Sequence, residues 1–171
     1  LLRVTGVQTC ALPIFPTAGF PCVGVTNAGA IAVGPFVGVI VGIVNAKMDP
    51  VDGKMTAGSI SLDTPQFRVA STKQFVLVAD APDIIFEAEA DASVALASVG
   101  LNVGLLEAAG SASTGNSAFQ VDAGTENTTA TLPLQIVGLS RRVDNEFASA
   151  SNKVLVRINV HSYGSVGVAG V

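Results

Sequence analysis

Asn152-Lys-Val-Leu-Val-Arg-Ile-Asn-Val-His161 is the stretch that decides the fold, because its side chains alternate between two kinds. Alternation with a period of two is typical of a β-strand with one face in the core and the other in water. We expect Val154, Val156, Ile158 and Val160 on the core face, and Leu155, Arg157, Asn159 and His161 on the wet face. The stretch therefore predicts a half-buried strand.

A second strand is predicted just before this one, over Thr131-Leu-Pro-Leu-Gln-Ile-Val-Gly-Leu-Ser140. The connection between the two contains Arg141-Arg-Val-Asp-Asn-Glu-Phe147, a run of mostly polar residues. The two strands and their connection predict a β-ribbon near the C-terminal end of the chain.

The composition extends this prediction to the whole chain. Hydrophobic residues make up 49%, aromatic residues only 5% and charged residues 13%, with 18 glycines and no tryptophan. A mixture rich in Val, Ala, Gly, Ser and Thr suits short strands and tight turns better than a helical bundle. We predict an all-β fold, a small β-barrel or sandwich with short helical turns and long loops. The net charge of -4 argues against nucleic-acid binding and favours protein partners.

The N-terminal segment carries a different signal. Val4-Thr-Gly-Val-Gln-Thr-Cys-Ala-Leu-Pro-Ile14 reads as the in-frame translation of a common sequencing-adapter oligonucleotide. We interpret residues 1–15 as an artefact of a draft or environmental assembly, which leaves the natural N-terminus open, and residues 16–171 as a single β-rich domain. The alternative is a signal peptide with Arg3 as its basic end. Under the artefact interpretation Cys22 is the remaining cysteine, so no intramolecular disulfide is expected.

The segment of residues 28–46 carries no charge, and its length approaches a membrane span. Gly34, Gly38 and Gly42 repeat a spacing that lets helices approach closely in lipid, so a membrane-associated protein is one alternative. Pro35 and the abundance of Val, Ile and Gly favour a strand over residues 36–44 instead, buried on both faces or in an oligomer interface. We therefore expect no membrane insertion.

Further strands are predicted over residues 66–69, 73–79, 84–91 and 118–121, with a short helix within residues 92–99 and a flexible loop over residues 110–117. In the strand over residues 84–91 the alternation places Phe86, Ala88 and Ala90 inside, and Glu87, Glu89 and Asp91 outside. The three carboxylates share one face and are candidate protein contacts. The alternatives are a solvated acidic face or cross-strand pairing with Lys153 and Arg157.

The chain resembles a family of tailed-bacteriophage structural proteins of the head-decoration or capsid-cement type. The resemblance covers residues 36–171 and is carried by residues 75–91, Ser98-Val-Gly-Leu-Asn102, residues 134–146 and Lys153-Val-Leu-Val-Arg-Ile-Asn-Val-His161. It implies a β-rich domain that sits on or between subunits of the major capsid protein, in a virion assembled in the bacterial cytoplasm. It also implies a homo-oligomer, with a trimer as one form. Arg141 and Arg142, beside Asp144 in a turn, are further candidate contacts with the coat protein.

No catalytic, cofactor or metal site is predicted. His161 is the only histidine, so neither a two-histidine metal site nor a serine triad with a spare base can be built around a motif. No phosphate-binding loop, dinucleotide fingerprint or nucleophile elbow occurs in a strand-to-helix setting. We therefore expect a non-enzymatic protein. A carbohydrate- or receptor-binding β module on a virion or cell surface is the alternative, although Tyr163 and the absence of Trp offer few aromatic platforms.

Overall fold

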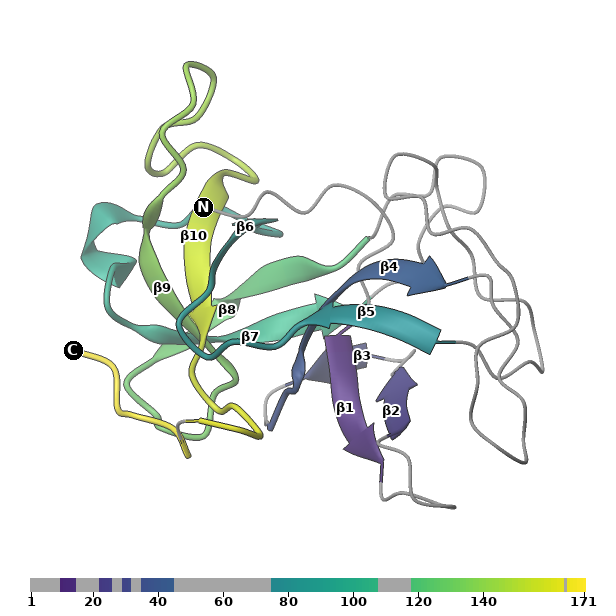
Figure 1. Cartoon of the computed structure of the whole chain (residues 1–171). Helices are drawn as coiled ribbons and strands as arrows, with labels where there is room; N and C mark the ends of the chain where they lie inside the picture. Colours follow the sequence, from purple (N-terminus) through teal and green to yellow (C-terminus); the bar gives the residue numbers. More distant parts are fainter. Residues whose placement is uncertain are drawn as a thin grey trace, which may run out of the picture.

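The computed structural model describes residues 10–14, 22–25, 29–31, 35–44, 75–107, 118–164 and 166–171. These residues form ten β-strands and one short 3-10 helix, so the predicted all-β class is confirmed. The strands make two antiparallel sheets in a sandwich-like arrangement rather than a closed barrel (Figure 1).

The smaller sheet has the strand order β2-β1-β4-β5. Its strands are β1 (Cys10–Ile14), β2 (Cys22–Val25), β4 (Gly38–Val44) and β5 (Phe75–Ala79). β4 and β5 lie within the segments for which strands were predicted from the sequence. Gly38 permits their pairing, because a Cβ at that position would lie 2.2 Å from the carbonyl oxygen of Ala79.

The larger sheet has the strand order β3-β7-β9-β10-β6, with β8 on the other edge of β7. Its strands are β3 (Gly29–Ile31), β6 (Ile85–Glu89), β7 (Asn102–Glu107), β8 (Gln120–Asn127), β9 (Leu134–Leu139) and β10 (Lys153–Ile158). The sheet curls, so that Ala90, just after β6, forms a bridge with Val121 in β8. The Asp91 amide donates to the Val121 carbonyl oxygen at 3.0 Å. This contact brings the two ends of the sheet together without closing a barrel.

The main core lies inside this curl. Its buried members lie in β6 to β10 or beside strands, and most are β-branched, as suits side chains packed on a pleated surface. They include Phe36, Ala90, Val94, Val103, Val121, Ile136, Val154 and Val156. Val39 of β4 and Ala79 of β5 pack against the same core, which couples the smaller sheet to the larger one.

The ribbon predicted near the C-terminal end is the β9–β10 pair. The two strands run antiparallel, with a register shift between Leu155 and Val156. Val154, Val156 and Ile158 are buried and Arg157 is exposed, as predicted. The prediction was wrong for Asn159 and His161, which are each only 3% exposed. The physical reason is that β10 ends at Ile158, so the alternation of faces stops there and both side chains turn inward.

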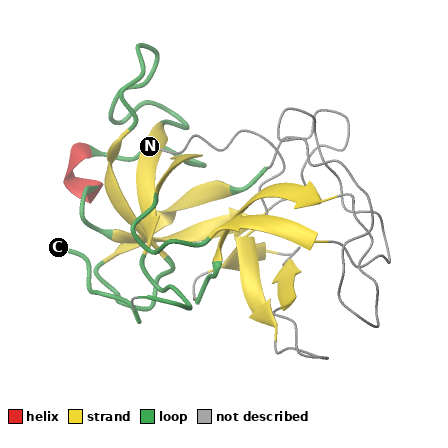
Figure 2. Ribbon diagram, in the orientation of Figure 1, coloured by secondary structure: helices red, strands yellow, loops and turns green. Residues whose placement is uncertain are grey.

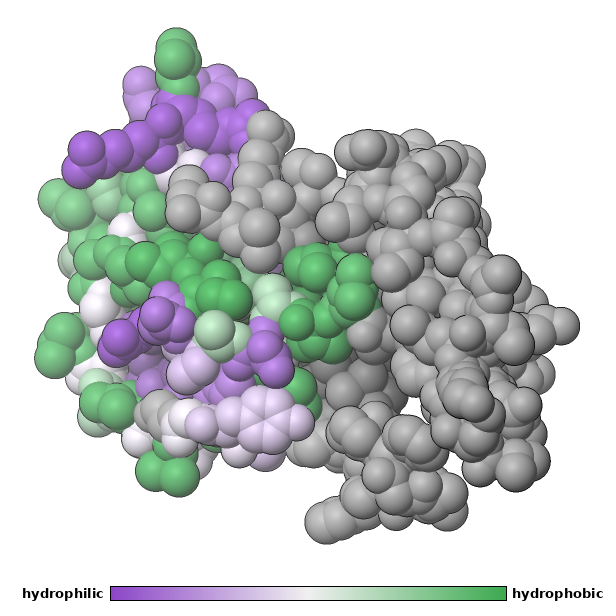
Figure 3. Space-filling view, viewed as in Figure 1, coloured by the Kyte–Doolittle hydropathy of each residue, from purple (hydrophilic) through white to green (hydrophobic). Residues whose placement is uncertain are grey.

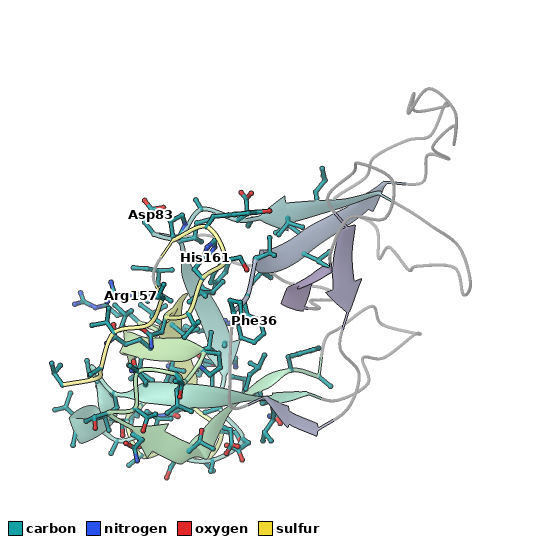
Figure 4. The ribbon with its side chains drawn as sticks, turned by 90° about the horizontal axis from the view of Figure 1, so that it is seen from below. Phe36, Asp83, Arg157 and His161 are labelled. Carbon is teal, nitrogen blue, oxygen red and sulfur yellow. The ribbon has the colours of Figure 1, made fainter. Side chains whose placement is uncertain are left out.

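Phe36 and His161 form the junction between the end of β10 and the start of β4 (Figure 4). The Phe36 amide donates to the Val160 carbonyl oxygen at 2.9 Å, and the Ser162 amide donates to the Phe36 carbonyl oxygen at 2.7 Å. The Nδ1 atom of His161 accepts the Tyr163 amide at 3.0 Å. His161 therefore serves the packing of this junction rather than a wet strand face.

The remaining predictions have mixed outcomes. The helix expected within residues 92–99 is a single turn, η1 (Leu96–Ser98), which Figure 2 shows as the one red segment. Ala95 before that turn and Val99 after it both have an extended backbone, which limits the helix to a single turn. The strand expected at residues 118–121 begins later, at Gln120, and runs on to Asn127. The strand at residues 66–69 and the loop at residues 110–117 lie outside the described residues.

The N-terminal predictions meet the structure at three strands. Part of the uncharged segment of residues 28–46 forms β3 and β4. Within the described part of the chain, no helix has the length and apolar character that crossing a membrane requires. Cys10–Ile14 forms β1, paired with β2 and β4. The hydrogen bonds between paired strands join backbone atoms, so they can form with most side chains. The pairing of β1 therefore does not test the adapter interpretation, which stays a prediction.

Candidate protein-contact site

The connection between β9 and β10, residues 140–152, is called the contact loop here. It projects beyond the strands of the larger sheet, at the top of the view in Figure 1. Both arginines that the sequence singled out lie in it, and Glu87 of β6 lies against its base. Arg142 and Glu87, one member of each candidate group, therefore come together at one place.

Two asparagines fix the path of the contact loop. The side-chain amide of Asn145 donates to the carbonyl oxygens of Ser140 and Lys153, both at 2.7 Å, while its oxygen accepts the Lys153 amide at 2.7 Å. Asn152, which is buried, exchanges hydrogen bonds with both backbone groups of Val94 at 2.9 and 3.1 Å. An Asn side chain offers a donor and an acceptor side by side, so it can replace a missing backbone partner on each strand end.

The contact loop also holds two residues in the left-handed region of backbone space. Ala148 has φ 60° and Ser151 has φ 53°. Such a conformation costs a residue with a Cβ about 1–2 kcal/mol, so the surrounding hydrogen bonds must fix it. One of these joins the Ala148 amide to the Val94 carbonyl oxygen at 3.0 Å. The contact loop therefore has a defined backbone conformation that hydrogen bonds fix.

Arg142 is paired inside the protein. Its Nη1 atom lies 2.9 Å from Oε1 of Glu87, and these side chains are only 31% and 13% exposed. The Ser140 hydroxyl donates to the other carboxylate oxygen of Glu87. Arg142 Nε also lies 3.6 Å from Asp144 Oδ1. A charge-assisted pair of this kind positions the base of the contact loop, and it leaves neither side chain free for a partner.

The acidic face predicted on β6 is divided among internal contacts. Glu89 Oε1 accepts the side-chain amide of Gln120 at 3.3 Å. Asp91 Oδ1 accepts the backbone amide of Ala123 at 2.9 Å and so caps the edge of β8. Lys153 lies opposite Glu89 in the ladder, while Arg157 donates from Nε to Oε1 of Gln135 at 2.8 Å. The candidate row is therefore not one continuous free surface.

The groups that remain available are at the tip of the contact loop. Arg141 and Asp144 are exposed, and Val143 between them is 107% exposed. Figure 3 shows a hydrophobic spot at the end of this projection, surrounded by hydrophilic surface. Val143 was not among the contact residues predicted from the sequence. The available signal was a β-branched apolar residue between Arg142 and Asp144 in a turn, where solvation alone would favour a polar side chain.

The contact loop presents exposed side chains at its tip. In the described ranges, no group of three or more His, Cys, Asp or Glu side chains is placed to hold a metal ion. The polar side chains around the contact loop satisfy backbone groups and each other at 2.7–3.3 Å. Comparisons of the chain with models of protein families, with curated proteins and with solved structures gave no match.

Proposed function

We propose that this chain is a non-enzymatic structural protein of a tailed-phage virion, which decorates or stabilises the capsid by binding subunits of the major capsid protein. The observation that carries the proposal is the contact loop, a fixed projection with an apolar tip. Val143 is fully exposed there, and Asn145 and Asn152 hold the backbone on either side. The resemblance of residues 36–171 to head-decoration proteins gives the class of partner.

The rigidity of the contact loop supports a docking role. A segment that is already ordered loses little conformational entropy when it binds, so even a small contact gives useful affinity. Strained left-handed residues such as Ala148 and Ser151 persist where the surrounding structure over-determines them, and they concentrate at functional sites. On a capsid the same small contact repeats at every lattice position, which multiplies its effect.

The tip also indicates the chemistry of the coat surface that would receive it. Val143 fits a shallow apolar depression, and the exposed guanidinium of Arg141 suits a carboxylate at its rim. Arg142 is held by Glu87 and would act by positioning the tip rather than by contact. The partner is therefore an acidic patch with an apolar centre on the coat protein.

The test is quantitative mass spectrometry of density-purified virus particles from the source material. The tryptic peptide Val143-Asp-Asn-Glu-Phe-Ala-Ser-Ala-Ser-Asn-Lys153 is followed relative to peptides of the major capsid protein. A ratio of about one, or a simple fraction of it, is expected for a protein at repeating positions of a symmetric shell. Trace copies, at the level of an abundant host protein used as a background control, would reject the proposal.

A further inference from the structure

Residues 166–171, called the tail here, form a second segment whose backbone is held in place by hydrogen bonds. The Val168 amide donates to Asn159 Oδ1 at 2.9 Å, and the Val168 carbonyl oxygen accepts the Asn102 side-chain amide at 2.6 Å. The amides of Gly170 and Val171 donate to the carbonyl oxygens of Thr128 and Gly100 at 3.0 and 3.2 Å. The tail therefore lies bound along the body of the protein for its whole length.

In the tail the glycines lie against the rest of the protein, and the apolar valines are exposed. Gly167 and Gly170 face the body: a Cβ at Gly167 would lie 2.2 Å from the Ala130 carbonyl oxygen, and one at Gly170 would lie 3.0 Å from the Asn102 amide nitrogen. The side chains of Val166, Val168 and Val171 are 93%, 54% and 91% exposed. Exposed apolar residues on a firmly held backbone mark a surface that another molecule covers.

The backbone of the tail also has a free edge. Ala169 is exposed, and its amide and carbonyl groups have no hydrogen-bond partner among the described residues. Proteins usually block such an edge against pairing with another chain. This chain does so at β8, where the Asp91 carboxylate occupies the Ala123 amide. In the part of the chain that the structure describes, no side chain occupies the Ala169 amide in this way.

Charge points to a second copy of this chain as the molecule that covers the tail. The chain carries a net charge of -4, so two copies repel over most of their surfaces, yet residues 158–171 contain no charged side chain. An extended edge is also complementary to itself, because two identical residues can face each other across a two-fold axis and exchange both backbone hydrogen bonds.

We propose that two copies of this protein associate tail to tail around a two-fold axis, with Ala169 pairing with Ala169 of the second copy and the exposed valines packing around the pair. Figure 1 places the C-terminus and the contact loop at different ends of the larger sheet, so a dimer formed this way leaves both contact loops free. This contact is independent of the proposed capsid binding.

Sedimentation equilibrium of the purified full chain tests the proposal. The wild type is expected to be a dimer that dissociates on dilution. Val168→Lys brings two like charges together at the axis and should raise the dissociation constant at least about tenfold. Val143→Lys is the matched control, because it makes the same change at an exposed valine away from the tail, and it should leave the dimer unchanged.

Hydrogen exchange gives a readout that does not depend on a variant. The Ala169 amide has no partner among the described residues, so it should exchange fast in dilute protein and slowly at high concentration. A monomer at every concentration, or a dimer that Val168→Lys leaves intact, would overturn the proposal. It would also be overturned if Val168→Lys weakened only the binding of the coat protein, which would then be the occupant. The oligomeric state and the exchange rate of Ala169 can both be measured whether or not the protein is found in particles.

Discussion

The contact loop and the tail are held in the same way and present opposite surfaces. In both, irregular backbone is fixed by the amide groups of two asparagine side chains, Asn145 and Asn152 in the loop and Asn102 and Asn159 at the tail. The loop surrounds one exposed valine with charged residues, whereas the tail exposes three valines and no charge. A common method of anchoring thus serves two kinds of recognition surface.

The two regions differ in how they are protected against association with an unsuitable partner. At the base of the loop, Glu87 neutralises Arg142, and Asp91 blocks the nearby edge of β8. Charge and capping oppose the random pairing of strands there. The tail has neither protection, which suits a surface that is normally covered by an identical one.

The largest expected effect is the loss of the anchor of the contact loop. Asn152→Ala removes the partner of the buried Val94 amide and a hydrogen bond to the Glu146 carbonyl oxygen. A buried donor left unpaired lowers the free energy of unfolding by about 3 kcal/mol. Urea unfolding measures it, with the exposed Val143→Ala as control, which should stay within about 0.5 kcal/mol of the wild type. Equal stability of the two variants would show that the loop is not anchored by Asn152.

The corresponding change at the tail should cost less. Asn102→Ala removes hydrogen bonds to the carbonyl oxygens of Thr129 and Val168, and water can replace part of what is lost, since both contacts are only partly buried. We expect about 2 kcal/mol in urea unfolding, together with faster proteolysis of the tail. A tail that resists proteases as well in the variant as in the wild type would contradict its anchoring by Asn102.

The ion pair at the loop base should contribute a smaller amount. Glu87→Gln keeps the shape of the side chain but removes its charge beside Arg142, and should lower the free energy of unfolding by about 1 kcal/mol. Glu89→Gln is the matched control on the same strand, because its 3.3 Å contact with Gln120 survives the change and the residue is exposed. If both variants unfold at the same urea concentration, the pair has no structural role.

The smallest effect has the opposite sign. Ala148→Gly relieves the left-handed backbone at φ 60° and should raise the free energy of unfolding by about 0.5–1 kcal/mol. Ala150→Gly, at an exposed position of the same loop, does not relieve such a conformation and should lower stability slightly. The thermal unfolding temperatures of the two variants measure this difference. A loss of stability in Ala148→Gly would show that the backbone at Ala148 is not strained.

The sequence was sufficient for some strands but not for β7, where no strand was predicted, and it was insufficient for the anchors. Alternating side chains predicted β6 and β10 because Phe86 and Val154 must be buried while Arg157 need not be. Asn159 and His161 were misplaced, since the alternation gives no sign of where a strand ends. An asparagine in a loop resembles an ordinary turn former, and its role depends on partners far away in the sequence. Asn152 binds Val94, and Asn102 binds Val168.

The candidate contacts show the same limit. The sequence indicated the arginines of the loop and the carboxylates of β6, but not that Arg142 reaches Glu87, which is 55 residues away. Pairing across that separation depends on β6 lying beside β10 in the folded sheet. Once that pair is formed, Val143 and Arg141 remain as the outward groups, a result that composition and spacing do not contain.

The most direct test of the account measures the binding of this protein to shells assembled from the major capsid protein alone. Labelled wild type, Val143→Lys and Val168→Lys are sedimented with the shells over a range of concentrations. Loss of the apolar tip should weaken the binding of Val143→Lys at least about tenfold, and the tail variant should lose much less. If Val143→Lys binds the shells as tightly as the wild type, the contact loop does not face the capsid.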